Sequence, residues 1–391
     1  MADGSIAIYV HFPFCLSICP YCDFDRQATG FDRVDTYVGA VQKEMAQYAG
    51  TSEEVHSIFF GGGTPSLMRP EHVASVLEDI GRTWRVRHDA EITLECNPGD
   101  ADLAKLSAFR QAGVNRLSIG VQSLDDRYLE LLGRRHSADA ARQAAAWARQ
   151  AGFAFNLDFM FGLPAQTLDH WSRTLEHALA EGPDHLSCYL LTVDERVPLG
   201  RDVARGRLTL PDDDELAAMY DLTRAHLAAA GYDQYEISNW ARPGRACRHN
   251  LTYWRDEPWI GLGAGAASSY AGRRWKNSPA LERYIGSVEA TGTAACVEDE
   301  QPDLATRMLD CLSLGLRLRE GISLATFRER FGQDALVVLG DTADWLLETG
   351  LLRVQGDRLT LDAERQFVIN EVLVRLDQAV RDTSSSHSAA R

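Results

Sequence analysis

The sequence predicts an α/β protein whose core is a partial barrel of six strand–helix units, a partial (β/α)6 barrel. Short runs rich in β-branched and aromatic residues alternate with longer amphipathic segments through the first half of the 391-residue chain. Such alternation is typical of right-handed βαβ crossovers and therefore of a parallel sheet. Polar and glycine residues follow the ends of several different strands, as in a barrel, whereas an open sheet would gather them at one point.

Six segments have the length and composition of strands. Between the first two, segment 34–48 has apolar residues at every third or fourth position, which predicts a helix with one buried face. The predicted strands are 6–12, 56–60, 91–95, 116–121, 153–160 and 185–192. The groups at the strand ends are the glycines 61–63, Glu95, Gln122 and Asp158.

The pattern changes after the sixth strand and divides the chain into four parts. Helical patterns near the end of the chain precede a hairpin around Gly356, which predicts an α+β region resembling a winged helix. The last residues are polar and are predicted to be disordered. The parts are the barrel core (1–195), an extension of the barrel (196–300), the C-terminal region (301–380) and the tail (381–391).

Composition narrows the classes of function. The 40 basic and 56 acidic side chains give a net charge of −16, which argues against a broad face for nucleic acid. No apolar run reaches the roughly 18 residues that span a bilayer, and the first residues do not resemble a signal peptide. We therefore expect a cytoplasmic protein with no nucleic-acid partner and no transmembrane segment, in which structural disulfides are rare.

Three of the eight cysteines, Cys15, Cys19 and Cys22, fall on the loop that follows the first predicted strand. Three thiolates can each bind a different iron of a [4Fe–4S] cluster, which leaves the fourth iron open for a small molecule. The alternative is a structural zinc site with His11 as the fourth ligand. Zinc sites usually pair two knuckles, and the chain has no second C-x2-C.

The spacing C-x3-C-x2-C, with an upstream strand and Tyr21 before the last cysteine, resembles the radical SAM superfamily. The resemblance implies that S-adenosylmethionine (SAM) binds the open iron and that the cofactors supply radical chemistry. It also implies that the glycine loop binds the methionine amino group and that Glu95 accepts hydrogen bonds from the ribose; a plain turn and a salt bridge are the alternatives. The implied SAM-binding residues are Tyr9, Tyr21, Gly62, Gly63, Thr64, Glu95, Gln122, Arg134 and Asp158. For the last three a structural role is an equal alternative.

Five further segments resemble the oxygen-independent coproporphyrinogen III oxidase family, from about residue 6 to residue 361. They are 9–15, 61–66, 120–124, 162–164 and 235–240. The dehydrogenase branch of this family carries a further cysteine two positions after the third, where this chain has Phe24. That branch also has an N-terminal arm, for which Cys15 leaves no room. Both differences put porphyrinogen oxidation in doubt.

The segment from Cys247 to Trp254 matches the HNxxYW motif of a second branch, the heme chaperones, at His249, Asn250, Tyr253 and Trp254. A neutral imidazole can bind heme iron, and Tyr and Trp can cover a flat apolar macrocycle. Cys247 is a second candidate ligand. The alternative is a buried histidine satisfied by hydrogen bonds. The glycine-dense segment 259–269 either cradles a ligand or allows close packing.

These observations predict a heme chaperone that binds heme, a [4Fe–4S] cluster and SAM and passes heme to an acceptor hemoprotein. An electron donor and a second copy of the chain are further candidate partners. The alternatives are a radical enzyme, such as a coproporphyrinogen III dehydrogenase or another porphyrin-modifying enzyme, and a scaffold protein stabilised by zinc.

Overall fold

The computed structural model describes the backbone of residues 4–389 and the side chains of residues 4–381. Residues 1–3 of the predicted barrel core and residues 390–391 of the predicted tail lie outside the described residues. No helix in the described part of the chain is both long enough and apolar enough to cross a bilayer.

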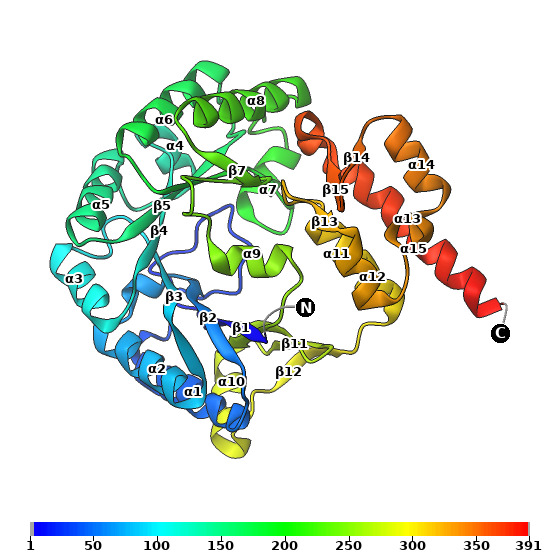
Figure 1. Ribbon diagram of the computed structural model, residues 1–391. Coiled ribbons are helices and arrows are strands. Elements are labelled where there is room, and N and C mark those ends of the chain that lie inside the picture. Colours follow the sequence, from blue (N-terminus) through cyan, green and yellow to red (C-terminus); the bar gives the residue numbers. More distant parts are fainter. Residues whose placement is uncertain (1–3, 390–391) are drawn as a thin grey trace.

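Six strands in chain order form the centre of the molecule, and each is parallel to the next. The curved sheet is surrounded by helices on its outer side (Figure 1). The strands are β1 (Ser5–Phe12), β2 (Glu54–Gly62), β3 (Arg85–Cys96), β4 (Arg116–Gln122), β5 (Ala154–Phe161) and β6 (His185–Leu190). The helices between them are α1 (Val34–Glu44), α2 (Pro70–Thr83), α3 (Leu103–Ala112), α4 (Asp126–Leu131), α5 (Ala138–Gln150) and α6 (Leu168–Ala180). The predicted partial six-unit barrel is confirmed.

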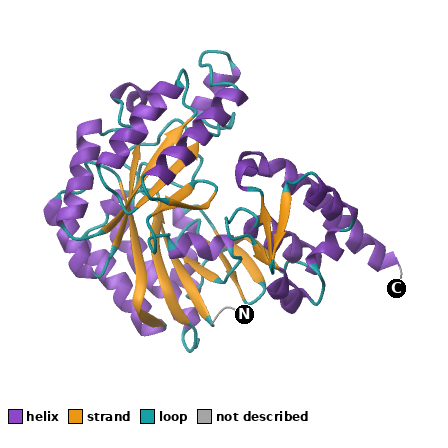
Figure 2. Ribbon diagram, turned by 45° about the horizontal axis from the view of Figure 1, so that its top comes forward, coloured by secondary structure: helices purple, strands orange, loops and turns teal. Residues whose placement is uncertain are grey.

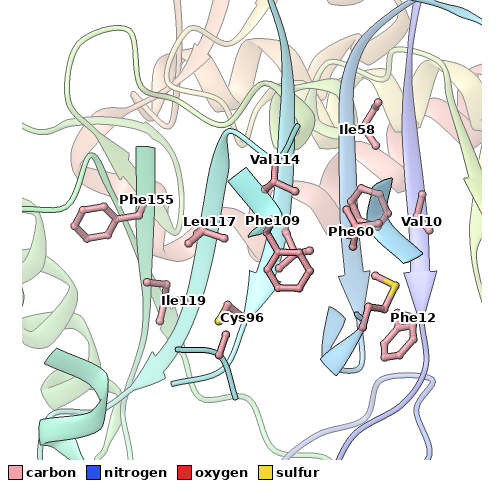
Figure 3. Packing of buried hydrophobic residues seen from close by; sticks show 14 of the residues in the cluster. Val10, Phe12, Ile58, Phe60, Cys96, Phe109, Val114, Leu117, Ile119 and Phe155 are labelled. Atoms are coloured by element: carbon pink, nitrogen blue, oxygen red, sulfur yellow. The ribbon is translucent and has the colours of Figure 1, made fainter. Parts of the chain in front are cut away.

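Alternation along the strands separates the core from the barrel interior. In β4, Leu117 and Ile119 are fully buried in the main core, whereas the intervening Ser118 lines a cavity inside the barrel. Successive side chains of a strand point to opposite faces, so the apolar set packs outward against helices such as α3, whose Phe109 is shown in Figure 3. The polar set is left for the interior.

The segment predicted as a single barrel extension adds strands to both edges of the sheet. At one edge β8 pairs antiparallel to β6, and at the other edge β9 pairs parallel to β1. The complete sheet has 12 strands. Its elements are α7 (Pro198–Ala204), α8 (Asp213–Ala229), β7 (Asp233–Glu236), β8 (Asn239–Ala241), α9 (Arg248–Trp254), β9 (Trp259–Leu262), β10 (Ala267–Tyr270), β11 (Arg273–Asn277), α10 (Leu281–Thr291) and β12 (Cys296–Glu300).

The glycine-dense segment 259–269 serves close packing. A Cβ at Gly261 would collide with the backbone of Ala267, and one at Gly263 would collide with the Tyr37 hydroxyl. The Gly263 N–H donates to the buried carboxylate of Glu44 at 2.9 Å. These contacts fix the segment between β1 and α1, and it is not among the segments that line the interior cavity.

The C-terminal region has a core of its own, drawn from residues 308–380, and stands beside the barrel (Figure 2). The predicted hairpin is present: Gln355 pairs with Arg358, and Gly356 adopts φ +60° in the two-residue turn. The elements are α11 (Leu304–Gly315), β13 (Ile322–Ser323), α12 (Leu324–Phe331), α13 (Ala335–Leu339), α14 (Asp341–Glu348), β14 (Leu352–Gln355), β15 (Arg358–Leu361) and α15 (Ile369–Ala389). Short 3-10 turns are η1 (Phe31–Arg33), η2 (Met45–Tyr48), η3 (Pro65–Leu67) and η4 (Ala363–Val368).

The last helix extends into the segment for which the sequence predicts disorder. Disorder is predicted over 381–391, whereas the backbone of α15 remains helical to Ala389. Adding a residue to an existing helix costs far less than starting one, so a polar tail can continue a helix that the preceding apolar residues have started.

Candidate functional site

The inward faces of the strands and the loops after them enclose a cavity of about 710 Å³. This volume lies within the range of small-molecule and cofactor sites. Every residue predicted to bind the cluster, SAM or heme lines this cavity, with the exception of Trp254. The fold therefore brings together three motifs that lie far apart in the sequence.

The loop after β1 carries three free, half-buried thiols, those of Cys15, Cys19 and Cys22. The glycine loop after β2 holds the start of the cysteine loop, because the Gly63 N–H donates to the Phe12 carbonyl at 2.8 Å. The Thr64 hydroxyl donates to the Cys15 sulfur at 3.5 Å. Burial raises the pKa of Cys15 and of Cys22. An electropositive partner such as iron favours the thiolate form that burial disfavours.

The donor set suits an iron–sulfur cluster better than a single zinc ion. Within the described residues, no three His, Cys, Asp or Glu side chains converge where one metal ion would bind. A cluster binds each cysteine at a different iron, so its three thiolates need only face a common space. His11, the candidate fourth zinc ligand, has both ring nitrogens hydrogen-bonded, to the Tyr9 hydroxyl at 3.1 Å and the Asp25 carbonyl at 2.8 Å.

The glycine loop and Glu95 form one unit at the ends of β2 and β3. Gly62 has φ +108°, and a Cβ there would overlap the His11 ring, so only glycine fits. The Gly62 N–H donates to Glu95 Oε2 at 3.1 Å. Burial, with a smaller contribution from Asp158, raises the pKa of Glu95 to about 8. The other carboxyl oxygen of Glu95 makes no hydrogen bond with the described residues, which leaves it for a polar ligand.

Arg134 places a positive charge beside the cysteine loop. Its Nη2 donates to the Gly120 carbonyl at 2.8 Å and to Asn97, while its Nη1 lies 3.7 Å from the Cys19 sulfur and 3.4 Å from the Tyr21 hydroxyl. The guanidinium thus ties the ends of β3 and β4 to the loop. Gln122, at the end of β4, is held at φ +67°, a region that non-glycine residues rarely adopt.

A polar floor surrounds Asp158, which accepts from Ser118 at 2.9 Å and from Asn156 at 2.7 Å. His185 extends the floor with Nδ1 2.7 Å from Asn156 Oδ1 and Nε2 2.9 Å from the Tyr235 hydroxyl. Burial raises the pKa of Asp158 and lowers that of His185. Ser118, Asn156 and His185 were not predicted as site residues. Ser118 lies four residues from Gln122 and Asn156 two residues from Asp158, while His185 pairs with Asn156 in register on the next strand.

His249 is a buried, neutral histidine with two hydrogen-bond partners. Its Nδ1 lies 3.1 Å from Ser57 Oγ and its Nε2 lies 2.9 Å from the Tyr253 hydroxyl. The residue is 2% exposed, and burial followed by the charges of His56 and Arg116 lowers its pKa to about 3. In the structure His249 is therefore a buried histidine whose two ring nitrogens are both hydrogen-bonded, and its side chain also lines the cavity.

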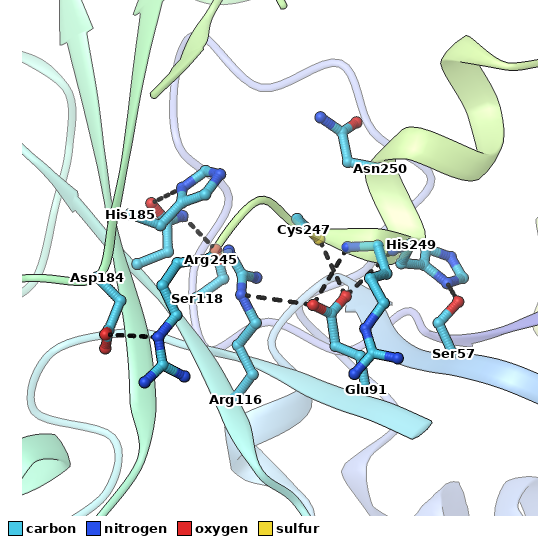
Figure 4. Close-up of polar contacts among 12 residues, drawn as sticks. Ser57, Glu91, Arg116, Ser118, Asp184, His185, Arg245, Cys247, His249 and Asn250 are labelled. Atoms are coloured by element: carbon cyan, nitrogen blue, oxygen red, sulfur yellow. Dashed lines mark hydrogen bonds and ion pairs between the residues drawn. The ribbon is translucent and has the colours of Figure 1, made fainter. Parts of the chain in front are cut away.

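Glu91 of β3 holds the start of α9. Its carboxylate accepts the backbone N–H of Arg248 at 3.2 Å and of His249 at 3.1 Å, and the Cys247 thiol donates to it at 3.3 Å (Figure 4). Burial raises the pKa of Cys247 to about 12, so this thiol is a hydrogen-bond donor here. The buried Arg116 lies 4.0 Å from the same carboxylate.

The remaining motif residues face different ways. Asn250 of the HNxxYW motif donates to the Tyr235 hydroxyl at 3.2 Å. Tyr235 belongs to the family segment 235–240, so this hydrogen bond joins the two segments. Trp254 instead lies outside the cavity, with the Arg317 guanidinium 5.5 Å from its ring centroid. Its predicted role in covering a macrocycle does not match this position: four residues of helix bring Tyr253 and His249 to one face and leave Trp254 on another.

His136, which was not predicted as a site residue, also lines the cavity. His136 Nε2 lies 3.1 Å from the Val121 carbonyl. A carbonyl can only accept, so Nε2 carries the proton and Nδ1 carries the lone pair. Nδ1 makes no hydrogen bond with the described residues. Burial, helped by the charge of Arg134, lowers the pKa of His136 to about 4, so the ring is neutral at pH 7.

Comparison with known families agrees with this geometry. The model of the radical SAM superfamily matches residues 9–178, and that of the HemN C-terminal domain matches residues 303–366. The fold and the cavity define a radical SAM protein, a class whose cofactors are a [4Fe–4S] cluster and SAM. Coproporphyrinogen III oxidase (HemN) from Escherichia coli has the same fold: the TM-score is 0.82 at 22% identity, over 96% of this chain and 90% of that chain.

Two curated relatives are similar over nearly their whole length. The heme chaperone HemW of Bacillus subtilis is 35% identical, covering 93% of this chain and 97% of the relative. The heme chaperone HemW of Mycobacterium tuberculosis is 37% identical, covering 95% of each. The chain therefore belongs to the family of the heme chaperone HemW.

Proposed function

We propose that this protein binds heme in the cavity between the cysteine loop and α9 and passes it to an acceptor hemoprotein in the cytoplasm. The observation that carries the proposal is that α9, with the HNxxYW motif of a family named for heme chaperones, forms one wall of the cavity that the three cluster cysteines face. Heme bound there would lie near the cluster. An electron donor and a second copy of the chain are proposed as further partners.

Cys15, Cys19 and Cys22 would hold the cluster, and Gly62, Glu95 and Arg134 would bind SAM beside it. When bound, these cofactors supply one-electron chemistry. Tyr9, Tyr21, Gly63, Thr64, Gln122 and Asp158 would complete the SAM site. The protein itself contributes the Arg134 charge next to Cys19 and a neutral Glu95 that can share a proton with a ribose hydroxyl.

Two neutral histidines are candidates to bind the iron of heme. His249 would exchange its Tyr253 partner for iron and keep Ser57, since ligating histidines retain a hydrogen bond on the second nitrogen. His136 already has that arrangement, with the Val121 carbonyl on Nε2 and a lone pair on Nδ1. We propose His249, with Asn250 and Tyr253 in the same wall and with Cys247 as a second candidate ligand that must first lose its proton.

Anaerobic heme titration of the full-length, cluster-loaded protein tests the proposal. Wild type is expected to bind heme with a Soret band that changes in His249→Ala and is unaffected in His136→Ala. Tyr253→Phe should bind heme more tightly, because it frees His249 Nε2 without removing a ligand. Failure of wild type to bind heme contradicts the proposed function. Heme binding that is lost in His136→Ala and unchanged in His249→Ala would reassign the ligand to His136.

A further inference from the structure

The cysteine loop exposes three large apolar side chains at the mouth of the cavity. Leu16 is 45% exposed, Ile18 50% and Phe24 64%, and all three line the cavity. Exposed apolar side chains that gather at a concave site, rather than singly, mark a place where an apolar ligand binds. Phe24 lies in a bend of the loop, where the Arg26 guanidinium donates to its backbone carbonyl at 2.6 Å.

One arginine that lines the same cavity has no bonded partner among the described residues. Arg135 is exposed and makes no hydrogen bond or ion pair with the described residues. Its charge acts on the half-buried carboxyl of Asp100, where it opposes the larger effect of burial, which raises the pKa. Of the other three cavity arginines, Arg26 and Arg134 donate to backbone carbonyls. Arg116 is buried 4.0 Å from Glu91 and its Nη2 has no hydrogen-bond partner, but unlike Arg135 it is not exposed.

Cavity size favours a ligand that extends to this mouth. About 710 Å³ is in the range of one drug-sized ligand, and the inner part is bounded by the groups proposed to bind SAM. A macrocycle that enters beside SAM therefore keeps part of its surface at the mouth. A flat apolar face with carboxylates on one edge matches a loop of apolar side chains beside a free guanidinium, which is well suited to binding carboxylates.

We propose that the macrocycle of heme rests on Leu16, Ile18 and Phe24 at the mouth of the cavity, with a propionate on Arg135. This inference rests on the proposed function and names the part of the cavity that holds the ligand; it is independent of which histidine binds the iron. It also assigns a use to Phe24, which stands where the dehydrogenase branch has a cysteine: an aromatic platform for the porphyrin.

The test uses the full-length, cluster-loaded protein, with heme and heme dimethyl ester, in which both propionates are esterified, as probes. Phe24→Ser should weaken both ligands about tenfold, because a stacking surface is lost. Phe24→Tyr keeps the ring and should bind like wild type. Arg135→Gln should weaken heme about three- to tenfold and leave the ester unchanged, because only the free acid offers a carboxylate.

Matched controls lie away from the cavity. Val374→Ser removes a side chain that is 70% exposed on α15, and Arg173→Gln removes an exposed arginine on α6; both should bind like wild type. Heme affinities of Phe24→Ser and Arg135→Gln within twofold of wild type would overturn the inference while leaving the proposed function intact. If Phe24→Ser fails to hold its cluster, the result for Arg135→Gln tests the inference by itself. In that case, an equal loss of affinity for heme and for the dimethyl ester overturns the inference. A wild type that binds neither ligand contradicts the proposed function itself.

Discussion

Glu91 and His249, 158 positions apart in the sequence, are joined by a hydrogen bond of 3.1 Å between the Glu91 carboxylate and the His249 backbone nitrogen. The carboxylate lies at the N-terminus of α9, where helices present unpaired N–H groups and a partial positive charge. A residue of the barrel therefore sets the position of the helix that carries the family motif.

Removing the negative charge of Glu91 should destabilise the protein. Glu91→Gln weakens the cap on α9 and leaves the buried Arg116 without its counter-charge, so we expect a loss of about 3 kcal/mol in the free energy of unfolding. Urea unfolding measures it. Glu130→Gln, at an exposed position of α4, is the control and should change stability little. A loss below about 0.5 kcal/mol for Glu91→Gln would show that the contact is not stabilising.

Two glycine substitutions should have opposite effects. A Cβ at Gly63 would lie 2.7–2.8 Å from backbone atoms of Phe12, Pro13 and Phe14, so Gly63→Ala should cost about 2 kcal/mol through overpacking and should weaken SAM binding. Gly81 lies within α2 with no atom near its added Cβ. Gly81→Ala should therefore stabilise the protein by about 1 kcal/mol. Thermal unfolding and SAM titration measure both; a tolerated Gly63→Ala would contradict the packing argument.

Glu95 should make stability fall as pH rises. Its pKa is raised from 4.5 to about 8 in the folded chain, so the folded state binds more protons than the unfolded state between these values. Its favourable contribution is complete below pH 4.5 and is lost as pH rises through about 8. Without added SAM, the stability of wild type relative to Glu95→Gln should drop by about 3 to 4 kcal/mol between pH 5 and pH 8.

Other groups titrate in the same range, including the buried Glu44, whose pKa is raised to about 7 by burial. They are present in both proteins and cancel in the comparison. A relative stability that is independent of pH would show that Glu95 is ionised in the folded chain at pH 5 as well as at pH 8.

The cluster assignment predicts which cysteines matter. After anaerobic reconstitution with iron and sulfide, Cys19→Ala should lose the broad visible absorption of a [4Fe–4S] cluster, because one iron loses its thiolate. Cys296→Ala is the matched control: this thiol is half-buried on β12, outside the cavity, and its loss should leave the spectrum unchanged. Iron and sulfide analysis should follow the spectra. An unchanged spectrum in Cys19→Ala would remove this residue from the ligand set.

Much of the site was predictable because it lies on a repeated local pattern. Cys15, Gly62, Glu95 and Asp158 were found as polar or small residues at the ends of predicted strands, and parallel strands of one barrel bring those ends together. Ser118 and His185 were missed, although they share the inward face of the same strands. A consistent use of the two-residue period would have found them.

Other relationships could not be predicted from local pattern. The pairing of β9 with β1 and the contact of Glu91 with α9 depend on which distant segments meet, which no periodicity records. The motif around His249 indicated a ligand site, but its two hydrogen bonds to Ser57 and Tyr253 and the outward position of Trp254 follow only from how α9 is seated.

The sequence by itself determined the α/β class, the six strands and the three-cysteine loop, because alternation, strand composition and metal-ligand spacing are local properties of the chain. Only the tertiary structure decided that the extension adds strands to both edges of the sheet and that the glycine-dense segment packs against Tyr37 instead of lining the cavity. It also decided that Arg135 makes no hydrogen bond or ion pair with the described residues. These depend on contacts between residues far apart in the chain, where burial and charge neutralisation are settled by the fold as a whole.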